Sequence, residues 1–116
     1  MSRSQPEGHA AYMKVWRKAN PDKWRAIARR AHLKKKYGIT PEQYTEMLEF
    51  QEGTCALCAR TAAQSRYGVL RVDHDHTTKR VRGLLCDFCN RALGILGDNI
   101  VGLERVMTYL RRGGYE

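Results

Sequence analysis

Hydrophobic positions recur at helical spacing among basic residues in the first third of the chain. Residues 10–19 predict a short amphipathic helix after a disordered start over residues 1–9. Asn20 followed by Pro21 is typical of an N-cap and a first helical position, so a second helix is expected to begin there. This helix is expected to run to about Lys36, because a tyrosine and a glycine follow as a stop.

A third helix is predicted over residues 41–51. Thr40 and Gln43 stand at the spacing of a capping box, with proline between them at the first helical position. The apolar positions expected to form its buried side are Tyr44, Met47, Leu48 and Phe50. Gly53 is expected to end this helix and to lead the chain into a pair of cysteines.

The second half of the chain predicts a β-hairpin followed by two helices. Residues 69–73 and 81–85 are short runs rich in β-branched and aliphatic residues, separated by a polar turn. Residues 86–96 predict a helix that a glycine stops, and Asp98 is expected to cap a last helix. The elements together indicate an α+β fold.

The chain has 116 residues, which allows one small domain, or a domain with an arm, whose core needs further support. Its net charge of +9 resides in residues 1–37, which hold 11 lysines and arginines against Glu7 and Asp22. Concentrated positive charge favours a nucleic-acid partner; a well-solvated helix face is the alternative. We expect a DNA-binding helical arm over 1–37 and a folded domain over 38–116, with arm contacts from Arg25, Arg29, Arg30, Lys34, Lys35 and Lys36.

Two CxxC pairs, Cys55/Cys58 and Cys86/Cys89, frame the middle of the chain. No secretory leader and no long apolar span is visible, so we expect an intracellular, reducing, cytoplasmic location without membrane insertion. There the pairs predict a zinc site, with disulfides or inert buried cysteines as the alternatives. Four thiolates leave no open position on the zinc, so this ion would hold the fold.

Asp73, His74 and Asn90 are the candidate catalytic residues. Carboxylate and amide oxygens suit Mg²⁺ or Mn²⁺, and a histidine can take a proton from water near neutral pH. Asn90 follows Cys89 directly and would face the hairpin end across the zinc-held turn. Strict strand alternation sends Asp73 and His74 to opposite faces, so such a site requires a bend or bulge. A surface strand end with solvated histidines is the alternative.

The stretch from about Tyr37 to Gly94 resembles the HNH, or ββα-metal, nucleases, and within them the phage recombination endonuclease VII group. The elements that carry the resemblance are Tyr37-Gly38-Ile39-Thr40, Cys55-x-x-Cys58, Val72-Asp73-His74-Asp75-His76, Val81-Arg82-Gly83-Leu84-Leu85-Cys86 and Cys89-Asn90-Arg91-Ala92-Leu93-Gly94. The resemblance implies zinc on the four cysteines, a catalytic divalent ion on Asp73 and Asn90, and His74 as the general base. His76 would assist at the phosphate or the metal.

The resemblance further implies a ββα-metal core and a metal-dependent DNA endonuclease that leaves a 5′-phosphate and a 3′-hydroxyl. Four arginines surround the proposed centre and are expected to contact phosphate, with pairing to Glu or Asp as the alternative for some of them: Arg71, Arg80, Arg82 and Arg91. The alternatives are a resolvase of branched DNA, which requires a homodimer rather than a monomer, and a noncatalytic zinc-containing DNA-binding module. Two positions depart from the group: Lys79 replaces a frequent turn glycine, and Leu93 replaces an additional carboxylate.

Overall fold

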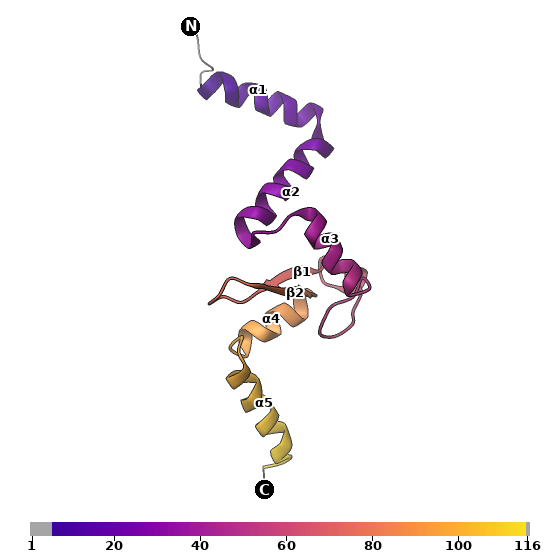
Figure 1. Ribbon diagram of the computed structural model, residues 1–116, viewed down its shortest axis with the longest axis vertical. Helices are drawn as coiled ribbons and strands as arrows, with labels where there is room; N and C mark the ends of the chain where they lie inside the picture. The colour runs from indigo at the N-terminus through magenta and orange to yellow at the C-terminus, as the bar shows by residue number, and fades with distance from the viewer. Residues whose placement is uncertain (1–5, 116) are drawn as a thin grey trace. The chain divides into compact units, whose positions relative to one another are not determined.

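The computed structural model describes residues 6–115 (Figure 1). These residues form five α-helices, a short 3₁₀ helix and one two-stranded antiparallel sheet, which is the expected α+β composition. They group into two compact units that divide between Pro41 and Glu42. Across the described part of the chain, no helix combines the length and the apolar composition that spanning a bilayer requires.

The first unit consists of helices α1 (Pro6–Ala19) and α2 (Pro21–Tyr37). Helix α1 starts earlier than expected, so the prediction of a disordered start is wrong for residues 6–9, and residues 1–5 lie outside the described range. The two helices meet at Asn20 (Figure 1). Asn20 holds the N-cap position, but its amide makes no cap to α2 and instead donates to the Trp16 carbonyl at 2.9 Å.

Helix α2 ends as the sequence predicts. Gly38 has φ +73°, a left-handed conformation that glycine adopts without a steric penalty, and its N–H donates to the Lys34 carbonyl at 2.9 Å. The Ile39 N–H reaches the Leu33 carbonyl at 3.4 Å and completes the cap. Leu33 and Ile39 are the buried aliphatic side chains of this stretch.

Helix α3 (Pro41–Phe50) follows, and all of it except Pro41 belongs to the second unit. Tyr44, Met47 and Leu48 are partly buried, as expected, but Phe50 is 89% exposed, so its placement on the buried side is wrong. The Tyr44 hydroxyl donates to the Leu70 carbonyl at 2.6 Å and so joins α3 to the residue that precedes the hairpin. This bond fixes a helix of ten residues that has no fully buried side chain of its own.

Gln51 attaches the end of α3 to the hairpin through its side-chain amide. Its Nε2 donates to the Leu84 carbonyl at 2.9 Å, and its Oε1 accepts from the Leu84 N–H at 2.9 Å. The amide therefore bonds Leu84 as a neighbouring strand would. A Cβ at Gly83 would lie 3.2 Å from this Oε1, so the close approach favours glycine there.

The hairpin consists of β1 (Arg71–His74) and β2 (Val81–Leu85), paired antiparallel. Strand β1 starts two residues later than predicted, because Val69 is 53% exposed and lies outside the ladder. Leu84 is fully buried, and with its neighbours it forms the core of this unit: Leu70, Val72, Leu84, Leu85, Cys55, Cys86 and Cys89.

The hairpin turn is organised by Asp75. Its carboxylate accepts the backbone N–H groups of Thr77 and Thr78 at 2.8 and 3.0 Å, and these bonds lower the pKa of the carboxyl below its usual value. Lys79 has φ +67° in this turn. The turn thus adopts at Lys79 the left-handed conformation for which a glycine is the ordinary choice.

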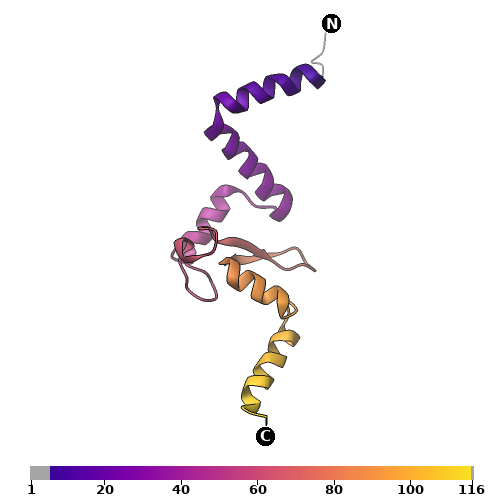
Figure 2. The same cartoon turned by 180° about the vertical axis from the view of Figure 1, so that it is seen from behind.

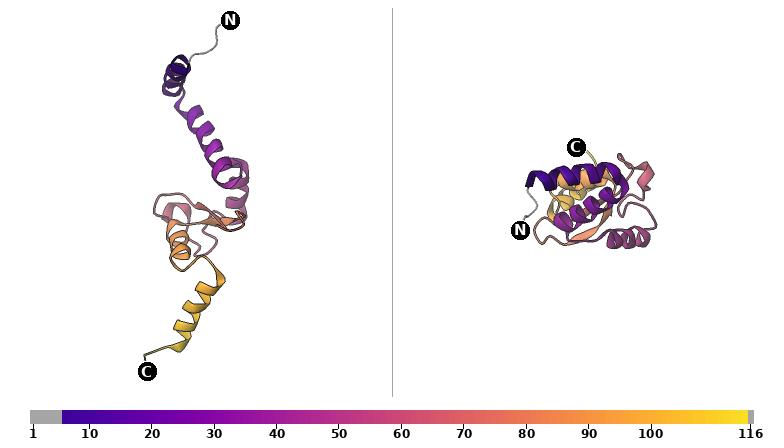
Figure 3. Two further views of the ribbon diagram at one scale, coloured as in Figure 1. Left: turned by 90° about the vertical axis from the view of Figure 1, so that its left-hand side faces the viewer. Right: turned by 90° about the horizontal axis from the view of Figure 1, so that it is seen from above.

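Helix α4 (Asp87–Ile95) packs against both strands of the hairpin (Figures 2 and 3). Helix α5 (Ile100–Arg112) follows, and its N-cap is Asn99, which accepts the Gly102 N–H at 2.8 Å. The prediction that Asp98 caps this helix is wrong. A Cβ at residue 102 would lie 1.9 Å from the Leu96 carbonyl oxygen, so the α4–α5 turn requires glycine there.

Candidate metal centre and active site

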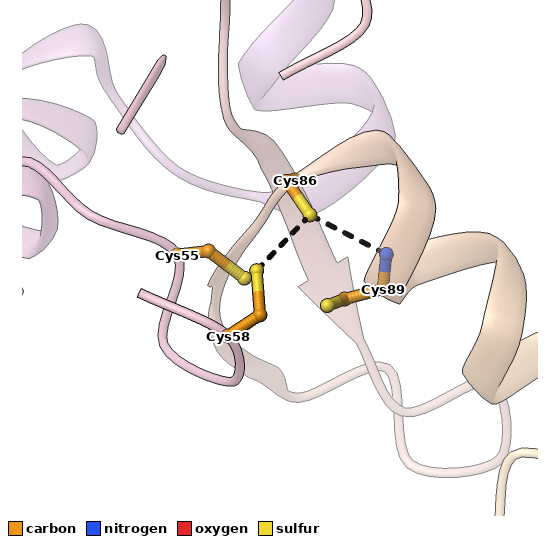
Figure 4. A group of neighbouring side chains, drawn as sticks. All are labelled: Cys55, Cys58, Cys86 and Cys89. Atoms are coloured by element: carbon orange, nitrogen blue, oxygen red, sulfur yellow. Dashed lines mark hydrogen bonds between the residues drawn. The ribbon is translucent and has the colours of Figure 1, made fainter. Parts of the chain in front are cut away.

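The four cysteines form one cluster that joins two distant segments of the chain. Their sulfurs all lie within 4.8 Å of one another, and Figure 4 shows the side chains converging on a common point. The Cys58 and Cys86 sulfurs are 3.6 Å apart, and a tetrahedral zinc with bonds of about 2.3 Å separates its sulfurs by about 3.8 Å. The donor set and spacing therefore fit a zinc ion, and the predicted metal-binding cluster is confirmed.

The environment of the sulfurs differs between exposed and buried members. Hydrogen bonding from the Arg60 backbone lowers the pKa of Cys58 to about 6, which favours the thiolate that binds a metal. Arg60 also donates from its guanidinium to the Cys58 sulfur at 3.3 Å. Burial raises the pKa of the Cys89 thiol, so a cation is needed to hold this sulfur as a thiolate.

Local backbone bonds shape both CxxC turns. In the first turn, the Cys55 N–H donates to the Arg60 carbonyl at 2.7 Å, and Ala59 closes the turn at φ +65°. In the second, Cys86 is the N-cap of α4, and its sulfur accepts the Cys89 N–H at 3.4 Å (Figure 4). The metal cluster thus fixes the start of α4 against the loop that follows α3.

The end of strand β1 contains the irregularity that the candidate site requires. Asp73 pairs with Gly83, but His74 pairs with Val81, so the register shifts between Asp73 and His74. Arg82 of β2 has no partner in this ladder, so the extra residue of the bulge lies on β2. The expected irregularity is therefore present at this end of the hairpin.

Asp73 is buried, with 8% of its surface exposed, and its charge is neutralised by Arg82. The Arg82 Nε donates to Asp73 Oδ2 at 2.7 Å, and its Nη2 donates to Oδ1 at 3.0 Å. This bidentate geometry raises the pKa of Arg82 and fixes the orientation of the carboxylate. Each carboxylate oxygen can accept a second bond, so Asp73 retains capacity for a cation.

Asp98 is the residue that sequence reasoning missed at this centre. Its Oδ1 accepts from Arg82 Nη2 at 2.6 Å, and its Oδ2 lies 3.8 Å from His76 Nε2. Asp98 has φ +54°, and Gly97 before it has φ +97°. Both Asp98 and Asn99 are residue types that cap helices. In the structure Asn99 caps α5, and the Asp98 carboxylate instead accepts a hydrogen bond from Arg82 of the hairpin.

The remaining predicted catalytic residues lie on elements that contact each other. The His74 and His76 rings are 4.8 Å apart between centroids and tilted by 55°. Asn90 is half-buried in the first turn of α4, and its N–H donates to the Cys86 carbonyl at 3.0 Å. Helix α4 packs against β1, so the strand that carries Asp73 and the helix that carries Asn90 belong to one packed unit.

The protein groups available to a second cation are few. Among residues 6–115, the cysteines form the sole group of three or more His, Cys, Asp or Glu side chains whose ligand atoms come this close together. Asp73 and Asn90 offer oxygen atoms, which suit Mg²⁺ or Mn²⁺. Mg²⁺ keeps several waters and is held by one or two carboxylates together with substrate phosphates. Asp73 and Asn90 would supply two of the oxygen ligands of such a site.

Arg82→Met is expected to lower the free energy of unfolding by about 2 kcal/mol, because it leaves the buried Asp73 carboxylate without its partner. Urea denaturation followed by circular dichroism measures this change. Arg80→Met is the matched control, since Arg80 is exposed in the adjoining turn. Equal stability of the two variants would contradict a structural role for the Asp73–Arg82 pair.

The predicted DNA-contact residues fall into separate groups. Arg25 pairs with Asp22 at 2.6 Å on the exposed surface of α2. The last turn of α2 carries three basic residues, Lys34, Lys35 and Lys36, all exposed. Arg71 and Arg91 lie near a different acid, Asp87, and Arg80 is exposed in the hairpin turn.

Comparison with known proteins identifies relatives of most of this chain. The sequence model of the family described as recombination endonuclease VII matches residues 30–112. The Gene 59 protein of Mycobacterium phage D29 is 49% identical over 77 residues, which cover 66% of this chain and 46% of that protein. The Gene 59 protein of Mycobacterium phage L5 is 45% identical over 75 residues, covering 64% and 44%. The chain thus matches about half the length of each phage protein.

A solved structure is also similar. The match is to the ββα-Me type II restriction endonuclease Hpy99I, with a TM-score of 0.48 and 29% sequence identity. It covers 73% of this chain and 49% of that one.

Proposed function

This chain belongs to the recombination endonuclease VII family, and we propose that it is a metal-dependent endonuclease that hydrolyses phosphodiester bonds in DNA. One observation supports this proposal most directly. The register shift between Asp73 and His74 lies at the end of a hairpin whose neighbouring helix is fixed by the four-cysteine cluster. A noncatalytic zinc module would need the cluster but not this distortion of the strand.

Asp73 and Asn90 would hold the catalytic Mg²⁺ or Mn²⁺. When bound, such an ion polarises the phosphate and stabilises the developing charge on the leaving oxygen. Arg82 supports this role because its two bonds to Asp73 hold the carboxylate in one orientation. Zinc is the ion that we assign to the four cysteines, where it has no open coordination position and holds the fold.

His74 is the general base in this proposal. Its imidazole takes a proton from a water molecule, and the water oxygen forms a new bond to phosphorus while the bond to the 3′ oxygen breaks. The products are a 5′-phosphate and, after the leaving oxygen is protonated, a 3′-hydroxyl. His76, 4.8 Å from His74 between ring centroids, is close enough to assist at the same phosphate, and Asp98 orients it.

Incubation of the purified protein with supercoiled plasmid and with a four-way DNA junction, in Mg²⁺ or Mn²⁺, tests the proposal. We expect nicked or linear plasmid with 5′-phosphate ends. Cleavage confined to the junction, together with a dimer in solution, would favour a branched-DNA resolvase instead. DNA binding without any cleavage would contradict the enzyme and favour a DNA-binding module. The phage origin of the relatives supports action inside a bacterial host.

The basic arm over residues 1–37 is proposed to hold the DNA backbone. Replacing Lys34, Lys35 and Lys36 by glutamine keeps residues with good helix propensity and is expected to weaken duplex binding. The slope of log K against log salt should become less steep by up to about 2.7, because each phosphate contact contributes about 0.9. Fluorescence anisotropy at several salt concentrations measures this slope.

A matched control for the arm replaces Arg105, Arg111 and Arg112 by glutamine, since these exposed residues of α5 carry the same total charge. Both variants should retain the helical circular dichroism of the wild type. If the lysine variant kept the wild-type slope, these three lysines would not contact the DNA backbone, and other basic residues would have to supply the contacts.

A further inference from the structure

Three arginines from separate segments converge on one buried carboxylate beside the candidate active site. Asp87, the first residue of α4, has a side chain only 8% exposed. Arg71 Nε lies 3.1 Å from its Oδ1, while Arg66 Nη1 and Arg91 Nη1 each lie 3.9 Å from its Oδ2. Arg66 comes from the loop before the hairpin, Arg71 from β1 and Arg91 from α4.

The charges of this cluster do not balance. One carboxylate faces three guanidinium groups, and within residues 6–115 these arginines form ion pairs with no other acid. Asp87 Oδ2 is buried without a hydrogen-bond partner, because the Nη1 atoms of Arg66 and Arg91 lie 3.9 Å from it. These two nitrogens therefore remain available to donate to another acceptor. Positive groups held this close repel each other unless an anion lies between them.

The arginines are also oriented rather than loosely solvated. The Arg66 and Arg71 guanidinium groups each lie 5.2 Å from the centroid of the Tyr67 ring. Contact with an aromatic face stabilises a guanidinium while its edges, which carry the N–H donors, remain available. The side chains of Arg66, Arg71 and Arg91 are 50%, 44% and 59% exposed, so an anion outside the protein can reach them.

We propose that Arg66, Arg71 and Arg91 bind one phosphate of the DNA backbone next to the phosphate that is cut, with Asp87 as the positioning residue. This inference rests on the proposed nuclease function. Guanidinium groups suit this ligand because their paired N–H donors match phosphate oxygens. The ligand is a backbone phosphate rather than a base edge, so the site carries no sequence preference of its own.

The position of the cluster supports the assignment to a neighbouring phosphate. Arg71 and Asp73 are two residues apart on β1, so their side chains start on the same face, separated by about 7 Å along the strand. Arg91 directly follows Asn90 on α4. A phosphate in the cluster would therefore fix the register of the DNA strand relative to the residues proposed for catalysis.

The surroundings of Arg82 differ in charge from those of Arg66, Arg71 and Arg91. It lies between two carboxylates, those of Asp73 and Asp98, at 2.7 and 2.6 Å. Its group has an excess of negative charge, whereas the Asp87 group has an excess of positive charge. Arg82 therefore serves as a counterion inside the protein, and the phosphate contact falls to the Asp87 group.

The test compares the full chain in a His74→Ala background, which prevents cleavage, with the same chain carrying Arg66→Gln, Arg71→Gln, Arg91→Gln or all three. Anisotropy with a labelled duplex in Mg²⁺ gives the affinity and the salt slope. Since the three arginines share one phosphate, the triple variant should flatten the slope by about 0.9, not by the 2.7 of three separate phosphates. Each single variant should weaken binding about 3- to 10-fold.

Arg105→Gln is the matched control, because it removes the same charge from an exposed position on α5. If the cluster variants bound DNA like this control, the phosphate site would be refuted, even in a protein that cuts DNA. A wild-type protein that binds DNA with the expected slopes but never cuts it would refute the nuclease and leave the phosphate site standing. Inorganic phosphate, replacing chloride at equal ionic strength, should displace DNA from the wild type more than from the triple variant, because it competes for the same arginines. Equal displacement from both proteins would contradict a phosphate site in this cluster.

The Asp87→Asn variant distinguishes a positioning role of the Asp87 carboxylate from the effect of its negative charge on DNA binding. The variant gains one positive charge, so long-range attraction alone predicts tighter DNA binding. Loss of the carboxylate that holds three arginines predicts the opposite, about 3- to 10-fold weaker binding. Unchanged metal content shows that the adjacent cysteine cluster is intact. Tighter binding by a metal-loaded Asp87→Asn protein would refute the positioning role.

Discussion

His74→Ala should lower the rate of DNA cleavage by about 10²- to 10⁴-fold, the usual cost of losing a general base. Binding of duplex DNA should remain close to that of the wild type, because the substitution removes no fixed positive charge and leaves Asp73 paired with Arg82. The measurement combines single-turnover cleavage of a labelled duplex in Mg²⁺ with anisotropy for binding. A loss confined to the cleavage rate would identify His74 as part of the chemistry.

His9→Ala is the matched control, since His9 is exposed in α1 and lies in the other unit. It should leave the cleavage rate unchanged. Asp73→Ala and Asn90→Ala should instead lower the affinity for the catalytic metal, so that a high Mn²⁺ concentration restores part of their activity. Cleavage by His74→Ala at the wild-type rate would remove this residue from the mechanism.

Removal of the metal from the four-cysteine cluster should unfold the second unit. A structural zinc contributes about 10–16 kcal/mol in small zinc-binding peptides, whereas a whole domain is stable by only about 5–15 kcal/mol. The core that would remain is small, and three of its buried members are cysteines that bind the metal. Metal analysis should find one zinc per chain, and a chelator should abolish the cooperative thermal transition seen by circular dichroism.

Substitution of single cysteines refines this experiment. Cys89→Ser should lower zinc content and thermal stability strongly, because it places a poorer ligand at a buried position. His74→Ala serves as the control that keeps all four sulfurs and should hold its zinc. A folded protein that contained no metal and whose thermal transition ignored the chelator would contradict the assignment of the cluster.

The sequence alone determined the elements and the metal cluster, because these depend on local signals. Two CxxC pairs are specific enough to predict that distant segments meet, and the glycine at residue 38 ended its helix as predicted. The need for an irregularity at the strand end followed from strand alternation, and the register shifts there, with the extra residue on β2. Helical periodicity failed where burial decided the outcome, as at Phe50, which is exposed.

Only the tertiary structure decided which charged groups meet. Asp98 is a residue type that often caps helices. In the structure its left-handed backbone conformation places the carboxylate against Arg82, and Asn99 caps α5. Asp87 and Arg66 carried no signal in the sequence, since a single acid and a loop arginine are common. Their meeting depends on three segments folding around the hairpin, because ion pairs act through space over a few ångströms and not along the chain.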